Sequence, residues 1–337
     1  MAKSRKRTAA TVKDVAKLAG VSAITVSRAL NSPDTVSAGT LKRVRRAIER
    51  TGYVPNLLAG GLRSARSKLV AAVVPTVAGP VFLDTIQALT DALDEHGYQL
   101  MLGQSGYRTS REDALLHAII GRRPVGMVLT GMVHSEQGRR RLLGAGIPIV
   151  ETWDLAPEPI DMAVGFDHER IGEAVCAHFH ACGRRRVALV SGDDERAHRR
   201  AKGFMRAARK LLLRAQVPVH WIPAPATLAA GREGLAQLLA REPRIDAVWG
   251  SSDLVALGVL TEAHQRGIAV PRDLAVVGFG DLQFAAGVVP AITTVRVDGA
   301  RIGRTAAHMI IDRAEGRDVT APIVDVGFSL VVRQSSA

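Results

Sequence analysis

The sequence predicts an α/β protein of two parts: a small N-terminal module of three helices, and a larger body of parallel sheets with helices on both faces. Three observations support this fold class. Basic residues crowd into the first fifth of the chain, the pattern changes near Leu69 from helical to alternating strand and helix, and that alternation runs through twice. Because 337 residues exceed the usual size of one domain, a body with an added module is expected.

Three short amphipathic helices are predicted before residue 51. A capping-box-like start at Thr11 opens the first helix, and Gly20 ends it. Ser22 caps the second helix, and Ser37 opens a third from about 38 to 50. The three helices are predicted to share one small core, and their apolar positions are Val12, Val15, Ala16, Ala19, Ile24, Val26, Ala29, Leu30, Leu41, Val44, Ala47 and Ile48.

Charge separates this module from the body. Residues 1–68 hold 15 Lys and Arg against 3 acidic residues, so they carry +12 of the chain's net charge of +13. A basic segment joined to a nearly neutral remainder is typical of a nucleic-acid-binding module attached to a regulatory or catalytic body. A solvated tail or a membrane-surface patch is the alternative, and it is disfavoured because the segment is not of low complexity.

The stretch "TVKDVAKLAGVSAITVSRALN" (11–31) has the pattern of a helix-turn-helix, whose second helix enters the major groove of DNA. An ordinary helical hairpin is the alternative, but the basic charge beside the motif favours DNA binding. Side chains near the start of the second helix would reach base edges or phosphates: Ala23, Ile24, Thr25, Ser27 and Arg28. The leading pair, Ala23 and Ile24, can offer only apolar contact, for example to a thymine methyl group.

From Leu69 onward, short apolar β-rich runs alternate with amphipathic helices, and the rhythm restarts at "AVGFD" (163–167). Two passes of this alternation predict two similar lobes built on parallel sheets. Ligands of open parallel sheets bind outside the carboxyl ends of the strands, so the loops after the strands should line a cleft.

The segment "YVPNLLAGGLRSARSK" (53–68) joins the two parts. Its leucines allow a short helix, but Gly60 and Gly61 each cost about 1 kcal/mol relative to Ala inside one. A helix this short is marginal in water. The segment is therefore predicted to be a linker that becomes helical only with help.

Several classes of protein are disfavoured. Cys176 and Cys182, six apart in one helical stretch, have neither metal-ligand nor disulfide-framework spacing, so reduced core cysteines are expected. No apolar run approaches the roughly 18 residues of a membrane span, so a cytoplasmic protein is expected. No metal or cofactor is predicted. The motifs GxxxxGK(S/T), HExxH, GxGxxG and GxSxG are absent, which disfavours an enzyme, with a dispersed active site left as the alternative.

Segments along the chain carry a family resemblance. "VKDVAKLAGVSAITVSRALN", "VS" at 36–37, "GYVPN" at 52–56 and the following Ala59 and Leu62 are similar to the DNA-binding and hinge signature of the lactose-repressor (LacI) family. The later "SSDLVALGVL", "LAVVGFGD" and "ITTVRVD" are similar to that family's ligand-binding body in order and spacing, so the resemblance covers almost the whole chain. Within the family, "HGYQLMLGQSGY", "MAVGFD", "DERAHRRAKGF" and "VDVGFSL" most resemble the gluconate-utilisation repressors.

The resemblance implies a dimeric transcriptional regulator whose body has the fold of periplasmic sugar-binding proteins, with two lobes, three crossover strands and a ligand in the cleft. The implied domains are a DNA-binding domain at 1–62 with a hinge helix at about 56–63, and a periplasmic-binding-protein-like effector-binding and dimerisation domain at 63–337. The N-lobe is expected at about 69–162 plus about 290–320, and the C-lobe at about 163–289 plus about 321–333. No leucine-heptad extension follows "VVRQSSA", which favours a dimer over a helix-bundled tetramer.

The resemblance extends the set of DNA contacts. By position, Ala59 and Leu62 match hinge residues that enter the minor groove, where an apolar wedge unstacks a base step and bends the duplex. Packing of Leu62 on the body is the alternative. Tyr53 and Asn56 would hold the hinge and the phosphates. The residues expected to contact a palindromic DNA operator are Thr11, Val12, Ala23, Ile24, Thr25, Ser27, Arg28, Asn31, Thr35, Ser37, Tyr53, Asn56, Ala59 and Leu62.

The resemblance also implies effector contacts. In the family, the Arg three residues before the Gly of "DERAHRRAKGF" grips the ligand, which places that role on Arg200, and an upstream contact falls on Arg196. Two guanidinium groups suit a carboxylate or phosphate, with an exposed helix face as the alternative for Arg196. Many members carry an acid directly after the "GF" of "VVGFGD"; here that position is Gly280 and the acid is Asp281, which fits an anionic ligand such as a sugar acid.

The remaining effector contacts are predicted by their position after strands: Phe82, Tyr107, Trp153, Ser252 and Asp253. Core packing is the alternative for the aromatic residues, and capping of a helix is the alternative for Asp253.

The sequence thus predicts a repressor of a carbohydrate or sugar-acid utilisation operon, released from its operator by gluconate or a close sugar acid. The ligand would stabilise one lobe arrangement and change the distance between the two hinges of the dimer. Three alternatives stay open: a regulator that responds to another sugar or a purine, including one that needs its ligand to bind DNA; an enzyme that uses the cleft; and an architectural DNA protein indifferent to sequence.

Overall fold

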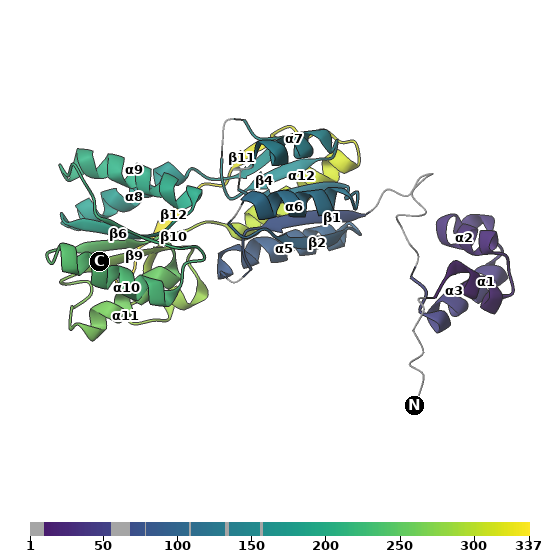
Figure 1. The fold of residues 1–337 in the computed structure, drawn as a ribbon, viewed down its shortest axis with the longest axis horizontal. Coiled ribbons are helices and arrows are strands. Elements are labelled where there is room, and N and C mark those ends of the chain that lie inside the picture. The colour runs from purple at the N-terminus through teal and green to yellow at the C-terminus, as the bar shows by residue number, and fades with distance from the viewer. Residues whose placement is uncertain (1–9, 55–67, 78, 108, 132–134, 156–157) are drawn as a thin grey trace, which may run out of the picture. The chain divides into compact units, whose positions relative to one another are not determined.

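The computed structural model describes residues 10–54, 68–77, 79–107, 109–131, 135–155 and 158–337 (Figure 1). The chain separates into two compact units, Met1–Ser67 and Lys68–Ala337. The predicted domain boundary at 62/63 and the predicted hinge helix at 56–63 lie outside the described residues.

The small unit contains α1 (Val12–Ala19), α2 (Ala23–Asn31), a 3-10 turn η1 (Pro33–Thr35) and α3 (Ala38–Thr51). The capping box predicted at Thr11 is confirmed, because its side chain and that of Asp14 each accept from the other's backbone N–H. Gly20 ends α1 in the left-handed conformation that favours glycine, and Ser22 and Ser37 cap α2 and α3 as predicted.

The three helices share one apolar core, which is built around the buried Val15, Val26 and Val44. Ile24, which the sequence predicts as a DNA contact, lies outside this core and is 68% exposed. A helix of eight or nine residues is marginal alone, so α1 and α2 depend on this shared core.

The body contains two six-stranded sheets, one in each lobe (Figure 1). The N-lobe sheet has the order β11-β5-β4-β3-β1-β2, with β1 (Leu69–Val74), β2 (Gln99–Gln104), β3 (Gly126–Thr130), β4 (Ile149–Thr152), β5 (Met162–Gly165) and β11 (Ile323–Asp325). The C-lobe sheet has the order β12-β10-β9-β8-β6-β7, with β6 (Val187–Gly192), β7 (Val219–Ile222), β8 (Ala247–Gly250), β9 (Ala275–Phe279), β10 (Thr293–Arg296) and β12 (Ser329–Val331).

Helices cover both faces of each sheet, as predicted. The N-lobe helices are α5 (Leu83–Glu95), preceded by the 3-10 turn η2 (Pro80–Phe82), then α6 (Thr109–Ile120), α7 (Glu136–Gly144) and α12 (Gly299–Ala314). The C-lobe helices are α8 (His168–Ala181), α9 (Glu195–Leu211), α10 (Leu228–Arg241) and α11 (Asp253–Gln265), followed by the 3-10 turn η3 (Gln283–Ala286). All strand pairs are parallel except β10 with β12.

Strand pairing corrects the predicted lobe boundaries. The run "AVGFD", expected to open the C-lobe, forms β5, which pairs with β4 in the N-lobe sheet. Conversely, β10 pairs with β9 in the C-lobe, and β11 pairs with β5 in the N-lobe. The chain therefore crosses between lobes after β5, β10 and β11. Local pattern could not reveal this, because strands covered on both faces all read as short apolar runs whichever sheet they join.

Two helices of the N-lobe, α7 and α12, are absent from the sequence interpretation. Within the described ranges, no helix is both long and apolar enough to cross a membrane. Cys176 is buried in α8, where burial raises its pKa to about 12, and Cys182 lies half-buried at the end of that helix; both are free thiols.

Candidate ligand cavity and DNA interface

The second helix of the small unit presents the side chains expected of a DNA-reading element. Ile24 stands at its start with 68% of its side chain exposed, and Ser27 and Arg28 are exposed on the following turn. Thr25 is half-buried, and its hydroxyl lies 2.9 Å from the Ser22 hydroxyl that caps the helix. Exposing a large isoleucine to water is unfavourable in so small a unit. Contact with a base would remove that apolar surface from water.

The other predicted DNA contacts divide into three groups. Thr11, Asn31, Thr35 and Ser37 are exposed, and Asn31 donates from its side-chain amide to the Ser27 hydroxyl. The half-buried positions are Val12, Ala23 and Tyr53, which pack against the three-helix core. Asn56, Ala59 and Leu62 lie outside the described residues.

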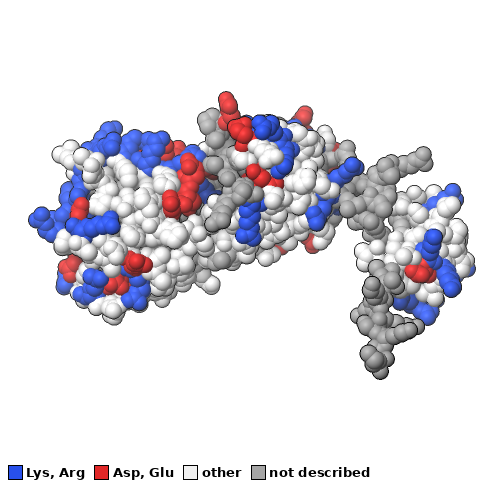
Figure 2. All heavy atoms as spheres, viewed as in Figure 1, with Lys and Arg blue, Asp and Glu red and all other residues white. Residues whose placement is uncertain are grey.

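Basic side chains surround these positions. In Figure 2, Lys and Arg side chains are spread over the small unit, with a small acidic patch among them. The exposed cations of the described part of this unit are Lys13, Lys17, Arg28, Lys42, Arg43, Arg45, Arg46 and Arg50. Such a surface would attract a phosphate backbone without regard to sequence, and base reading would then fall to the start of α2.

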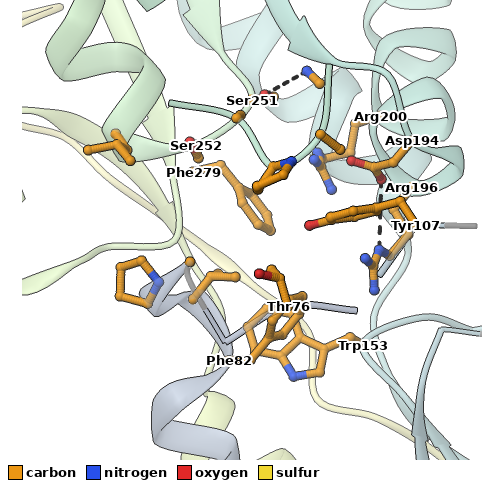
Figure 3. A pocket seen from close by; sticks show the side chains of 18 of the residues that line it. Thr76, Phe82, Tyr107, Trp153, Asp194, Arg196, Arg200, Ser251, Ser252 and Phe279 are labelled. Atoms are coloured by element: carbon orange, nitrogen blue, oxygen red, sulfur yellow. Dashed lines mark hydrogen bonds and ion pairs between the residues drawn. The ribbon is translucent and has the colours of Figure 1, made fainter. Parts of the chain in front are cut away.

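In the body, a cavity lies where the carboxyl ends of the strands of both sheets meet, as the parallel topology predicts. Six of the eight predicted effector contacts line it: Phe82, Tyr107, Trp153, Arg196, Arg200 and Ser252. Figure 3 shows Phe82 and Trp153 on one side, Phe279 and Arg200 on the other, and the Tyr107 hydroxyl directed into the space between them.

Arg200 is a buried cation on the C-lobe side, with 7% of the residue exposed. One of its guanidinium nitrogens lies 3.2 Å from Nδ1 of His168, and the guanidinium lies 4.4 Å from the centre of the Phe279 ring. Burial lowers the pKa of Arg200 to about 10, so the group stays charged at neutral pH. An anion in the cavity would therefore meet a desolvated positive charge.

Arg196 lies one helical turn earlier on α9 and has an unmet hydrogen-bonding requirement. Its Nη1 is buried and has no hydrogen-bond partner among the described residues. Its Nε is 3.9 Å from a carboxylate oxygen of Asp194, and its guanidinium is 5.4 Å from the Phe82 ring centre. A buried N–H without an acceptor is costly, and a ligand oxygen would satisfy it.

The N-lobe side of the cavity is aromatic. Trp153 follows β4, donates its indole N–H to the Thr85 hydroxyl at 3.0 Å, and packs edge-on against Phe82 at 5.1 Å between ring centres. Its backbone has φ of +65°, a strained conformation for a large residue that is typical of ligand-binding sites. Trp153 and Phe82 thus belong both to the lobe's core and to the cavity wall.

Two predicted effector contacts do not reach the cavity. Asp253 is fully buried at the start of α11, where it accepts from the Thr294 hydroxyl and the Leu282 backbone N–H. Asp281 has φ of +51° and turns toward Arg296 and Arg333, which bind its two carboxylate oxygens at 2.5 and 2.6 Å. These partners satisfy both carboxylates within the C-lobe, and neither Asp253 nor Asp281 lines the cavity in this structure.

Sequence reasoning missed several residues of the wall. Asp194 caps α9 by accepting from the Ala197 N–H, and Ser251 accepts from the Gly192 N–H, so both are placed by the ends of β6 and β8. His168 and Phe279 also line the cavity. Asp194 and Ser251 follow the ends of β6 and β8, and this position could have identified them from the sequence. His168 reaches the cavity because the chain crosses between the lobes after β5.

Comparisons with known proteins agree with this architecture. Residues 11–56 match the family described as "Bacterial regulatory proteins, lacI family", and residues 176–336 match the "Periplasmic binding protein-like domain". The chain is 37% identical over 327 residues to the "HTH-type transcriptional regulator GntR" of Pseudomonas aeruginosa, covering 97% of this chain and 95% of that protein. It is 30% identical over 342 residues to the "HTH-type transcriptional repressor CytR" of Escherichia coli, covering 100% and 99%.

Among solved structures, a LacI-family transcriptional regulator from Silicibacter pomeroyi superimposes with a TM-score of 0.91 at 30% identity, covering 97% of this chain and 99% of that one. A helix-turn-helix unit joined to a two-lobed body with a ligand cavity defines a DNA-binding transcriptional regulator, not an enzyme. The chain belongs to the LacI family of bacterial regulatory proteins.

Proposed function

We propose that this regulator is a homodimeric repressor of a sugar-acid utilisation operon, and that gluconate or a close sugar acid releases it from a palindromic operator. The ligand would bind the cavity of the body and favour one arrangement of the lobes. Operator affinity would then change by the ratio of the ligand's affinities for the two arrangements.

The unmet requirement of Arg196, next to the buried cation of Arg200, carries the choice of ligand. A carboxylate offers acceptors to two guanidinium groups at once, whereas a neutral sugar brings no negative charge to them. The hydroxyl groups of a sugar acid would find polar partners in Asp194, Ser251 and Tyr107 on the wall. The resemblance to gluconate-utilisation repressors supports the same choice.

A second candidate ligand is a planar heterocycle such as a purine. The aromatic rings of Phe82, Tyr107, Trp153 and Phe279 around the cavity favour it, because flat rings stack on one another. It leaves the two arginines without an anion, which makes it the weaker candidate.

Calorimetric titration of the full chain separates these ligands. Gluconate, other hexonic acids, the matching neutral sugars and purines are added in turn. We expect heat from the sugar acids, with affinity at least about tenfold tighter than for their neutral counterparts. No heat from any sugar acid, or an equal affinity for neutral sugars, would contradict the proposed ligand.

The DNA-reading role is tested by Ile24→Gln, which replaces an apolar contact with a hydrogen-bonding one. We expect a changed base preference at the matching operator position, worth about 1–3 kcal/mol, with little change in non-specific affinity. Selection of bound sequences from a randomised palindrome measures the preference. Leu18→Gln, at an exposed apolar position on α1, is the matched control, and equal effects of the two changes would refute the assignment.

A further inference from the structure

His168 occupies a place at which the two lobes meet. The N-lobe strand β5 ends at Gly165, and the C-lobe helix α8 begins at His168, so this residue directly follows a crossover between lobes. Its side chain is buried, with 1% of the residue exposed, and it lines the cavity. A buried imidazole requires partners for both of its nitrogens.

The two partners of His168 come from opposite walls of the cavity. Nδ1 lies 3.2 Å from the Arg200 guanidinium, which can only donate, so Nδ1 accepts. Nε2 lies 3.0 Å from the backbone oxygen of Trp153, which can only accept, so Nε2 carries the proton. These bonds fix one neutral tautomer. Burial, followed by the charges of Arg200, Arg196 and Arg199, holds the pKa of His168 well below its usual value.

One of these bonds lies within a rigid pair of helices. The backbones of α8 and α9 touch through Gly172 and Gly203, where an added Cβ would come 2.1 Å from the Arg200 oxygen and 2.0 Å from the Glu169 oxygen. His168 and Arg200 therefore move together as part of the C-lobe. The bond from Nε2 to the Trp153 oxygen is the one that reaches the other lobe.

The N-lobe end of this bond is equally well fixed. Trp153 is anchored through its indole N–H to the Thr85 hydroxyl, and its backbone has φ of +65°. Next to it, Asp154 is paired with Arg199 of α9 at 2.5 Å, a second contact between the lobes. The carboxylate of Asp154 lies 4.0 Å from Nε2 of His168.

We propose that His168 is a positioning residue that ties the anion-binding Arg200 to the arrangement of the lobes through the Trp153 carbonyl group. This inference rests on the proposed function only in treating Arg200 as an effector contact. An anion that draws Arg200 into a fixed orientation acts on the bond that Arg200 donates to Nδ1, and the imidazole transmits that orientation to the bond between the lobes. Binding of the effector at Arg200 thereby changes the bond between the lobes through His168.

Two substitutions each remove one of the two hydrogen bonds of His168. His168→Asn keeps an acceptor near the place of Nδ1 but cannot reach the Trp153 oxygen, whereas His168→Gln keeps a donor near the place of Nε2 but offers Arg200 no matching acceptor. His168→Leu removes both bonds at similar volume. Thermal unfolding of each full-length variant shows whether it folds.

We expect His168→Asn to bind gluconate within about threefold of the wild type, while the gluconate-induced loss of operator affinity shrinks at least about tenfold. His168→Gln should show the reverse, an affinity for gluconate about tenfold weaker with the full loss of operator affinity at saturation. The proposal is overturned if both variants match the wild type, or if both lose binding and coupling in the same proportion.

A readout without ligand keeps this inference separate from the proposed function. In the ligand-free full chain, hydrogen exchange of the backbone amides near 153–155 and 166–168 should be at least about tenfold faster in His168→Asn than in His168→Gln. If the wild type binds no sugar acid, the proposed function is wrong. The difference in exchange between the two variants still tests whether His168 links the lobes. Equal exchange rates in the two variants would show that His168 does not link the lobes, whichever ligand the protein binds.

Discussion

The two walls of the cavity differ in chemistry although the lobes that supply them have similar folds. The N-lobe wall is aromatic, with Phe82 and Trp153 that also belong to the lobe's core. The C-lobe wall carries the charges, with Arg196, Arg200 and Asp194 at the start of α9. One lobe thus offers a surface for a carbon skeleton and the other offers a site for charge.

This division links recognition to lobe arrangement. A ligand with equal affinity for both arrangements of the lobes shifts nothing, whereas a ligand that contacts both walls favours the arrangement that brings the two walls to it. The proposed sugar acid would place its carboxylate against the arginines and its carbon chain against the rings, so its full affinity would require both walls at once. Substitutions on the two walls are therefore expected to differ in their effects on ligand affinity.

The largest effect is expected from Arg200→Met, which keeps a side chain against Phe279 and removes the charge. We expect affinity for sugar acids to fall by roughly a hundredfold, because a desolvated charge-assisted hydrogen bond is lost. Affinity for a neutral sugar should change by less than about threefold. Calorimetry measures both, and an equal loss for charged and neutral ligands would show that Arg200 is structural.

A second effect concerns the stability of the fold, through the buried carboxylate of Asp253 in the C-lobe. Burial raises the pKa of Asp253 from 3.8 to about 6, even though Thr294 and Leu282 donate hydrogen bonds to it. Below about pH 4 this carboxyl is protonated in both the folded and the unfolded state. As pH rises toward 7, the folded state retains the proton longer and then ionises at a cost.

Through this group the free energy of unfolding therefore falls between about pH 4 and about pH 7, by at most on the order of 3 kcal/mol. Asp253→Asn should remove that dependence. Denaturant unfolding of the two full-length proteins at several pH values measures the difference between them. A difference that stays constant with pH, or one that grows in the opposite direction, would contradict the assignment.

The smallest effect is expected on the aromatic wall. Phe82→Leu keeps an apolar side chain but removes a ring, so affinity should fall by about tenfold or less. The loss should be similar for sugar acids and neutral sugars, since the ring contacts the carbon skeleton and not the charge. A loss confined to anionic ligands would mean that Phe82 acts mainly by holding Arg196, whose guanidinium lies 5.4 Å from its ring centre.

The sequence predicted features that depend on neighbouring residues. The capping box at Thr11, the turn at Gly20 and the caps at Ser22 and Ser37 were correct because each requires a particular residue within three positions of a helix end. The cavity at the carboxyl ends of the strands was also predictable, because parallel topology alone dictates it.

Features that depend on distant partners were missed or wrong. Nothing local distinguishes β5 as an N-lobe strand, and Asp281 is drawn from the cavity by Arg296 and Arg333, which lie 15 and 52 residues away. The stretch "EQGRRRLLG" of α7 has few apolar residues, so its helical period is faint. The role of His168 likewise depends on a partner 32 residues away on α9.

Operator binding by the full chain, with and without gluconate, tests the central claim most directly. Footprinting of the upstream DNA first locates the operator, and fluorescence anisotropy then gives the affinity. We expect saturating gluconate to weaken operator binding at least about tenfold, the matching neutral sugar to leave it unchanged, and Arg200→Met to bind the operator but ignore gluconate. Operator affinity unchanged by every sugar acid would contradict the account.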